Sequence, residues 1–195
     1  QLLYVNIMRN GIGLGCLGTH SFDLANFLFD AIPQNVTAWV DASYTRNPRG
    51  EHFVDPGGLV ILDYGNDRKA IISQVEKASG PMIVQLHFEQ ARVIVDVKYG
   101  ILELVSKSID GEVKSTNPQR HVNPQEFAVS HDTIVLMERI LENLISDTPM
   151  KADAIHGLHS VEILVASYQS SENGHIPISL PITDEKYLTK FLPVT

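Results

Sequence analysis

The chain has 195 residues, of which 44% are hydrophobic and 19% charged, a balance typical of one globular domain and not of a disordered or fibrous protein. Its formal net charge of -8 at pH 7, with no cluster of Lys or Arg, argues against a nucleic-acid partner or an anionic membrane surface. The partners that we expect are small molecules and other proteins.

The sequence also indicates where in the cell the protein is found and whether it is part of a longer chain. No apolar run reaches the roughly 20 residues that span a bilayer, so we expect no membrane segment. The single cysteine, Cys16, excludes an internal disulfide and is typical of a reducing compartment, which predicts a cytoplasmic protein. Because the chain begins at Gln1 without a Met and with a strand-like run already under way, we expect a fragment, a processed product or a cleaved form of a longer protein.

The first part of the chain predicts a strand, a helix and a second strand. Residues 2–8 are an apolar, strand-like run, and residues 19–31 place apolar side chains at helical spacing. Residues 36–44 alternate apolar and polar side chains, as a half-buried strand does. The polar stretch at 45–58, rich in Gly and Pro, is the longest predicted loop.

The middle and the end of the chain predict more strands followed by two helices. Residues 58–107 are β-rich runs joined by short turns, and such turns predict an antiparallel meander because a parallel crossover needs about a dozen residues. Ser130 can cap a second helix, and a third is predicted over 153–172, with Gly174 placed to end it. Residues 175–182 read as a short extended segment.

These elements predict an α+β fold, with an open, mainly antiparallel sheet and about three helices on one face. The opposite face of such a sheet is left without cover. We therefore expect a homodimer or a higher homo-oligomer formed through the open sheet face. Trp39 lies on the polar phase of its strand, and we expect it to pack in the core or at an interface.

The most conspicuous motif is a glycine pattern in "GIGLGCLGTHSFD". Gly13, Gly15 and Gly18 have the spacing G-x-G-x-x-G, which in dinucleotide-binding folds approaches a pyrophosphate. Such a fold must continue with alternating strands and helices, whereas no helical pattern lies between residues 31 and 130. The alternative is a glycine-rich turn between a strand and a helix.

Two segments resemble one family. "GLGCLGTHSFDLANFLF" is similar to the start of the C-terminal domain of the glucose-fructose oxidoreductase, inositol dehydrogenase and MocA family, and "ADAIHGLHSVEILVASYQSSENGHIPISLP" is similar to the closing helix of that domain. The resemblance implies a C-terminal domain of the glyceraldehyde-3-phosphate dehydrogenase type, which binds substrate and mediates oligomers. It further implies that NAD or NADP binds mainly to an N-terminal Rossmann domain that is not among these residues, so we expect this fragment alone to hold no cofactor and to be inactive.

His20 occupies the position of the catalytic histidine of that family. Oxidation of a sugar, a sugar derivative or a polyol-like hydroxy compound releases a hydroxyl proton, which a group with a pKa near neutrality removes well. Asp23 is three residues later and orients the imidazole or favours the helix dipole. Arg9 and Asn10 are candidate substrate contacts at the end of the first strand, and Cys16 stands where inositol dehydrogenase-like members have an Asp.

Other readings of these residues remain open. Cys16 and His20 form a conceivable thiol and base pair for nucleophilic catalysis. His156 and His159 share a helix face, but neither they nor His131 gives a convincing set of metal ligands, so we expect no metal. Cys16 and Met8, which replace an Asp and a His of related sequences, favour a non-catalytic ligand-binding or assembly module of the same fold.

Overall fold

A computed structural model gives the arrangement of the chain. It describes residues 1–10, 13–41, 50, 53–75, 80–96, 100–107, 112–116, 133–148, 153–190 and 192. The helix start predicted at Ser130 and the candidate ligand His131 lie outside the described residues, as do the end of the strand predicted over 36–44 and half of the loop predicted at 45–58.

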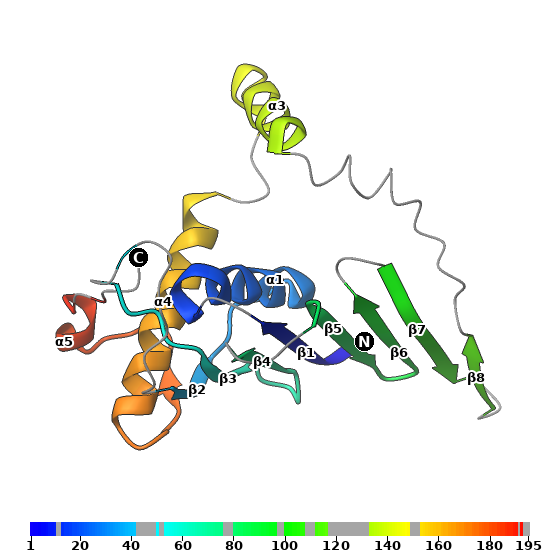
Figure 1. Cartoon of the computed structure of the whole chain (residues 1–195), viewed down its shortest axis with the longest axis horizontal. Helices are drawn as coiled ribbons and strands as arrows, with labels where there is room; N and C mark the ends of the chain where they lie inside the picture. Colours follow the sequence, from blue (N-terminus) through cyan, green and yellow to red (C-terminus); the bar gives the residue numbers. More distant parts are fainter. Residues whose placement is uncertain are drawn as a thin grey trace.

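Within the described residues, nine strands form one open sheet with the order β8-β7-β6-β5-β1-β4-β3-β2-β9 (Figure 1). In chain order the strands are β1 (Leu2–Asn10), β2 (Asn35–Val40), β3 (Gly58–Asp63), β4 (Lys69–Val75), β5 (Ile83–Phe88), β6 (Ala91–Asp96), β7 (Gly100–Lys107), β8 (Val113–Thr116) and β9 (Ile178–Ser179). All neighbouring pairs are antiparallel except β1 with β4. The predicted open, mainly antiparallel sheet is therefore confirmed.

Strand β1 interrupts the predicted meander, because it lies between β4 and β5. It runs parallel to β4, with Ile7 opposite Ile72, and antiparallel to β5, with Ile7 opposite Val84. Val5 and Ile7 are fully buried. A strand with such apolar residues is stabilised most at the centre of the sheet, where both of its edges are paired and one face is covered. As a result, the C-terminal end of β1, with Arg9 and Asn10, lies at the middle of the sheet.

The helices among the described residues are α1 (Thr19–Phe29), α3 (Thr133–Ile145), α4 (Ala154–Glu172) and the short α5 (Glu185–Leu188). A π-helical turn, η1 (Leu14–Gly18), leads directly into α1. α1 ends two residues before the predicted boundary, because Asp30 adopts a left-handed conformation with φ of 48°. None of these helices combines the length and the hydrophobicity that crossing a membrane requires.

The core lies between the sheet and the layer formed by α1 and α4 (Figure 1). Both helices and the facing strands contribute fully buried apolar side chains: Phe22 and Ala25 from α1, Ile163 and Ala166 from α4, and Val5, Ile7, Val60, Leu62 and Ile72 from the strands. Tyr64, which follows β3, donates its hydroxyl to Asn26 Oδ1 at 2.8 Å and so ties α1 to the sheet. This layer fixes the position of α1, on which His20 lies.

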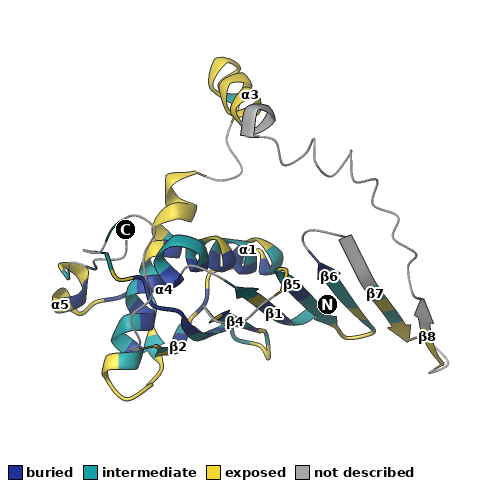
Figure 2. Ribbon diagram, viewed as in Figure 1, coloured by how far each residue is buried: buried dark blue, intermediate teal, exposed yellow. Residues whose placement is uncertain are grey.

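Helix α3 stands apart from the sheet and is largely exposed (Figures 1 and 2). Its exposed apolar side chains recur at helical spacing: Met137, Ile140, Leu141, Leu144 and Ile145. The amphipathic pattern that predicts this helix is therefore present, but its apolar stripe is not packed on the sheet. The helical layer on the sheet is made by α1 and α4.

Candidate functional site

The C-terminal end of β1 places Arg9 beside the glycine-rich stretch. The guanidinium of Arg9 donates a hydrogen bond to the carbonyl oxygen of Leu17 at 3.4 Å. Burial lowers the pKa of Arg9, and the nearby Cys16 side chain acts in the opposite direction. Asn10 instead donates from Nδ2 to the carbonyl oxygen of Gly80 at 2.7 Å. Arg9 and Cys16 are thus brought together, whereas Asn10 is held by the segment before β5.

The glycine-rich stretch is a turn of π-helix. The carbonyl oxygen of Gly13 accepts the backbone N–H groups of Leu17 at 3.1 Å and of Gly18 at 3.3 Å. π-Helical turns are rare and are frequently found at functional sites. The predicted turn between strand and helix is therefore itself helical, and it continues into α1 without a break.

The N–H groups at the start of this turn are bound by a side chain from another part of the sequence. Asp55 Oδ1 accepts the backbone N–H of Gly15, and Asp55 Oδ2 accepts that of Cys16, each at 2.7 Å. Asp55 is fully buried. The sequence analysis missed this residue, because "DPGG" reads as part of a polar loop and nothing in the spacing connects it with residues 15 and 16.

These contacts decide whether the glycine pattern fits a dinucleotide. The Asp55 carboxylate fills the place at Gly15 and Cys16 that a phosphate would take. A Cβ atom on Gly13 would lie 1.9 Å from the backbone oxygen of Asp55, so that face of the turn is covered by protein. The described residues of the turn do not fit a pyrophosphate, and the turn is an anion-binding turn whose anion is a carboxylate of the same chain.

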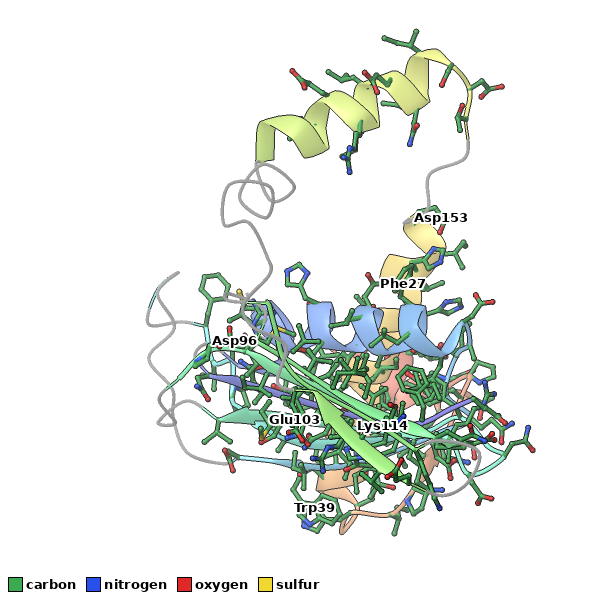
Figure 3. The ribbon with its side chains drawn as sticks, turned by 90° about the vertical axis from the view of Figure 1, so that its right-hand side faces the viewer. Phe27, Trp39, Asp96, Glu103, Lys114 and Asp153 are labelled. Atoms are coloured by element: carbon green, nitrogen blue, oxygen red, sulfur yellow. The ribbon has the colours of Figure 1, made fainter. Side chains whose placement is uncertain are left out.

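A groove of about 790 Å³ runs between α1 and the first turns of α4. His20 and Asp23 line it from α1, and His156 and His159 line it from α4. The His20 side chain is exposed, so a ligand in the groove can reach the imidazole. Phe27, which lines the same groove, lies on the α3 side of the sheet in Figure 3, and Trp39 lies on the opposite side.

The predicted site residues therefore fall into two groups. His20 and Asp23 face the groove, and Arg9 and Cys16 meet at the end of β1. Although His20 and Asp23 both belong to the described part of the chain, no hydrogen bond joins the imidazole and the carboxylate in this structure. The second wall of the groove, His156 and His159, was not predicted as part of the site.

Asp153 caps the α4 wall of the groove. Its Oδ1 accepts the backbone N–H groups of Ile155 at 2.9 Å and of His156 at 3.1 Å. His156 Nδ1 lies 2.8 Å from the same oxygen, and the two residues form a capping box. The hydrogen bond from the His156 side chain, followed by those from the backbone N–H groups, lowers the pKa of Asp153.

This cap predicts a dependence of stability on pH. Because the pKa of Asp153 is lower in the folded chain than in the unfolded one, its contribution is present above about pH 4 and is lost as the pH falls through the folded pKa. We expect Asp153→Ala to lower Tm by a few degrees at pH 7 and by less near pH 3, measured by circular dichroism. An equal decrease at both pH values would contradict this assignment.

Two further sequence predictions can be placed. Among the residues that the structure describes, no three His, Cys, Asp or Glu side chains are arranged to hold a metal ion. Trp39 is 40% exposed, and its ring stacks on that of His175, with centroids 5.2 Å apart. Trp39 is therefore not a core residue, and an interface role remains a prediction.

Comparison with known proteins identifies the fold. The sequence profile described as "Oxidoreductase family, C-terminal alpha/beta domain" matches residues 10–180. Among solved structures, the chain resembles yvaA of Bacillus subtilis, with 21% identity and a TM-score of 0.68. It also resembles an oxidoreductase of Agrobacterium radiobacter in complex with NAD+, L-tartaric acid and magnesium (14% identity, TM-score 0.62) and the WlbA dehydrogenase of Bordetella pertussis in complex with NADH and UDP-GlcNAcA (18%, 0.62).

These likenesses cover nearly all of this chain but only part of the others. The aligned region spans 92%, 92% and 93% of this chain and 58%, 57% and 57% of the three relatives, respectively. At such low identities they establish the fold and not the activity. No curated protein matches the sequence.

Proposed function

The chain belongs to the oxidoreductase family, as its C-terminal alpha/beta domain, and from this premise we propose that it binds substrate for an NAD(P)-dependent oxidoreductase acting on a sugar, a sugar derivative or a related hydroxy compound. The observation that carries the proposal is the exposed imidazole of His20 on a groove large enough for a small molecule. NAD or NADP would bind outside the described residues, since the glycine turn does not fit a pyrophosphate. The single cysteine supports extending the proposal to a cytoplasmic location.

The residues of this chain would bind the substrate and handle a proton. Oxidation of an alcohol carbon to a carbonyl carbon removes a hydride and a proton, and we assign the hydroxyl proton to His20. Asp23 lies on the same groove, where its negative charge favours the imidazolium that forms. Arg9 does not line the groove, so it would bind a hydroxyl or a carboxylate of a substrate that extends from the groove toward the end of β1.

The relatives support the substrate class. The WlbA structure contains NADH with a nucleotide sugar, and the Agrobacterium structure contains NAD+ with a hydroxy acid. The direct test is to titrate the intact protein with NADH and NADPH and then to screen sugars, sugar nucleotides and hydroxy acids for turnover. We expect turnover by the intact protein and none by residues 1–195 alone. Failure of the intact protein to bind either coenzyme would overturn the proposal.

The proposal includes a homodimer formed through the open face of the sheet. Ile61 and Ile71 are paired neighbours on β3 and β4 that alternate with buried residues, so they point away from α1 and α4. Exposed Met8 and Trp39 lie on the same face, by the alternation of β1 and β2. This face also carries polar residues such as Asn6 and Ser73, but its apolar side chains, with no helix of the described residues over them, are suited to packing against a second copy.

A charge in this face should weaken the dimer. We expect Ile71→Glu to raise the dimer dissociation constant at least about tenfold, because burying a carboxylate in an apolar interface is costly. Sedimentation equilibrium measures the change, and Arg139→Glu on α3 is the control. Equal dissociation constants for the Ile71 variant and the wild type would overturn the assignment of the dimer to this face.

A second candidate is a non-catalytic ligand-binding or assembly module. It is favoured by the thiol of Cys16 beside Arg9 and by the lack, within the described residues, of a hydrogen bond between His20 and Asp23. In that case the groove would bind ligands without turnover. Ligand binding that persists while all substrates remain unchanged would favour this function.

A further inference from the structure

The buried carboxylate of Asp55 contacts the π-helical turn η1, which leads into the helix that carries His20. Its two oxygens accept the backbone N–H groups of Gly15 and Cys16, each at 2.7 Å. Hydrogen bonds to an ionised carboxylate are short and stronger than those between neutral groups. Asp55 is fully buried, and a buried charge is tolerated only where such partners satisfy it. The charge of Asp55 also affects a neighbouring residue. Burial raises the pKa of Tyr168 on α4, and the negative charge of Asp55 raises that pKa further.

The contact is transmitted to His20 through continuous helix. η1 begins at Leu14 and passes into α1 at Thr19, so Gly15 and His20 belong to one helical segment. The Thr19 hydroxyl donates to the carbonyl oxygen of Gly15 at 3.2 Å and joins the two ends of this short stretch. Leu14 is also fixed, because its N–H donates to the carbonyl oxygen of Pro56 at 2.9 Å. A shift of the segment at 55 and 56 would therefore move the turn and, with it, the imidazole.

We propose that Asp55 is a positioning residue, whose carboxylate holds the backbone of Gly15 and Cys16 and thereby sets where His20 meets the substrate. The catalytic part of this inference rests on the proposed function of His20. The structural part does not, because the two hydrogen bonds can be measured without a substrate. The two parts are therefore tested separately.

The first test is an NMR measurement on the chain. We expect Asp55→Asn to shift the amide protons of Gly15 and Cys16 upfield and to speed their exchange with solvent about 10- to 100-fold, as expected for the loss of a charge-assisted hydrogen bond. Asp63→Asn is the matched control, because Asp63 Oδ1 also accepts a backbone N–H, that of Gly65, at 2.9 Å, but far from the turn in the sequence. It should leave both amides unchanged. Unchanged Gly15 and Cys16 amides in the Asp55 variant would overturn the proposal.

A measurement on the wild type covers the case in which this variant does not fold. Both amides donate to the same buried carboxylate. In the wild type we therefore expect the amide protons of Gly15 and Cys16 to exchange with solvent at least about tenfold more slowly than unbonded amides, measured by NMR. Exchange of both amides at the rate of an unbonded amide would overturn the inference.

The second test uses turnover by the intact protein. If Asp55 positions His20, Asp55→Asn lowers kcat about tenfold or more while KM changes little, since a misplaced base slows the chemical step more than binding. A decrease in kcat no larger than that of Asp63→Asn would overturn the positioning role. If His20→Ala proves harmless while the amide test succeeds, the proposed function fails and the contact of Asp55 with the turn stands.

Discussion

Replacing His20 by alanine in the intact protein is expected to lower kcat by about 10²- to 10⁴-fold, the range that general acid–base residues contribute. The imidazole is exposed on the groove, so its removal should leave the fold and the walls of the groove intact. Since methyl replaces a group that moves a proton in the transition state, KM should change little. Steady-state kinetics with the best substrate from the screen measures both constants.

The control for this experiment is another histidine of the same chain. His175 stacks on Trp39, and its Nδ1 lies 2.9 Å from the carbonyl oxygen of Ala38, away from the groove. His175→Ala should therefore keep the kcat of the wild type. A His20 variant that retains the wild-type rate would remove His20 from the mechanism and favour the non-catalytic module.

The glycine motif shows what local sequence can and cannot predict. The apolar run before it and the helical spacing after it predicted β1 and α1 correctly, because both patterns report burial of one face. The partner of the turn could not be predicted. Asp55 lies about forty residues away in the sequence, and only the pairing of β3 with β2 and β4 brings it beneath Gly15 and Cys16.

The strands of the sheet likewise differ in how well local sequence predicts them. Most strands were predicted from strand-like runs of residues, whereas β8 (Val113–Thr116) lies beyond the last predicted run, which ends at residue 107. Residues 112–114 are exposed, so β8 is held as an edge strand by its backbone pairing with β7, and side-chain patterns do not report such pairing. The position of β1 between β4 and β5 could not be predicted from the sequence either, because the order of strands in a sheet depends on contacts between segments that are distant in the sequence.

The groove also depends on such contacts. His20 was predicted from the family resemblance, but the wall opposite it is formed by His156 and His159, which approach α1 only because α4 packs beside it. In the sequence these histidines suggested a weak metal-ligand pattern. In the structure His156 instead belongs to the cap of α4, through Asp153. The helical spacing placed them on one face without indicating what that face meets.

The close approach at Gly13 predicts a large loss of stability. Its backbone, with φ of -62°, is accessible to alanine, so the cost of substitution is purely steric. The new Cβ atom would lie 1.9 Å from the backbone oxygen of Asp55 and 2.5 Å from that of Pro56. Because backbone cannot rotate away as a side chain can, residues 55 and 56 must move, and the hydrogen bonds to Leu14, Gly15 and Cys16 are disturbed.

We therefore expect Gly13→Ala to lower the free energy of unfolding by about 3 kcal/mol or more, the sum of overpacking and weakened hydrogen bonds. For a chain of this length this corresponds to a decrease in Tm of about 10 °C. Gly157→Ala makes the same chemical change on α4, where nothing lies within 4 Å of the new Cβ atom, and should stabilise the helix by up to about 1 kcal/mol. Urea and thermal unfolding measure both variants. If Gly13→Ala were as stable as the wild type, the turn would not be packed against Asp55 and Pro56, and the positioning of His20 through Asp55 would lose its structural basis.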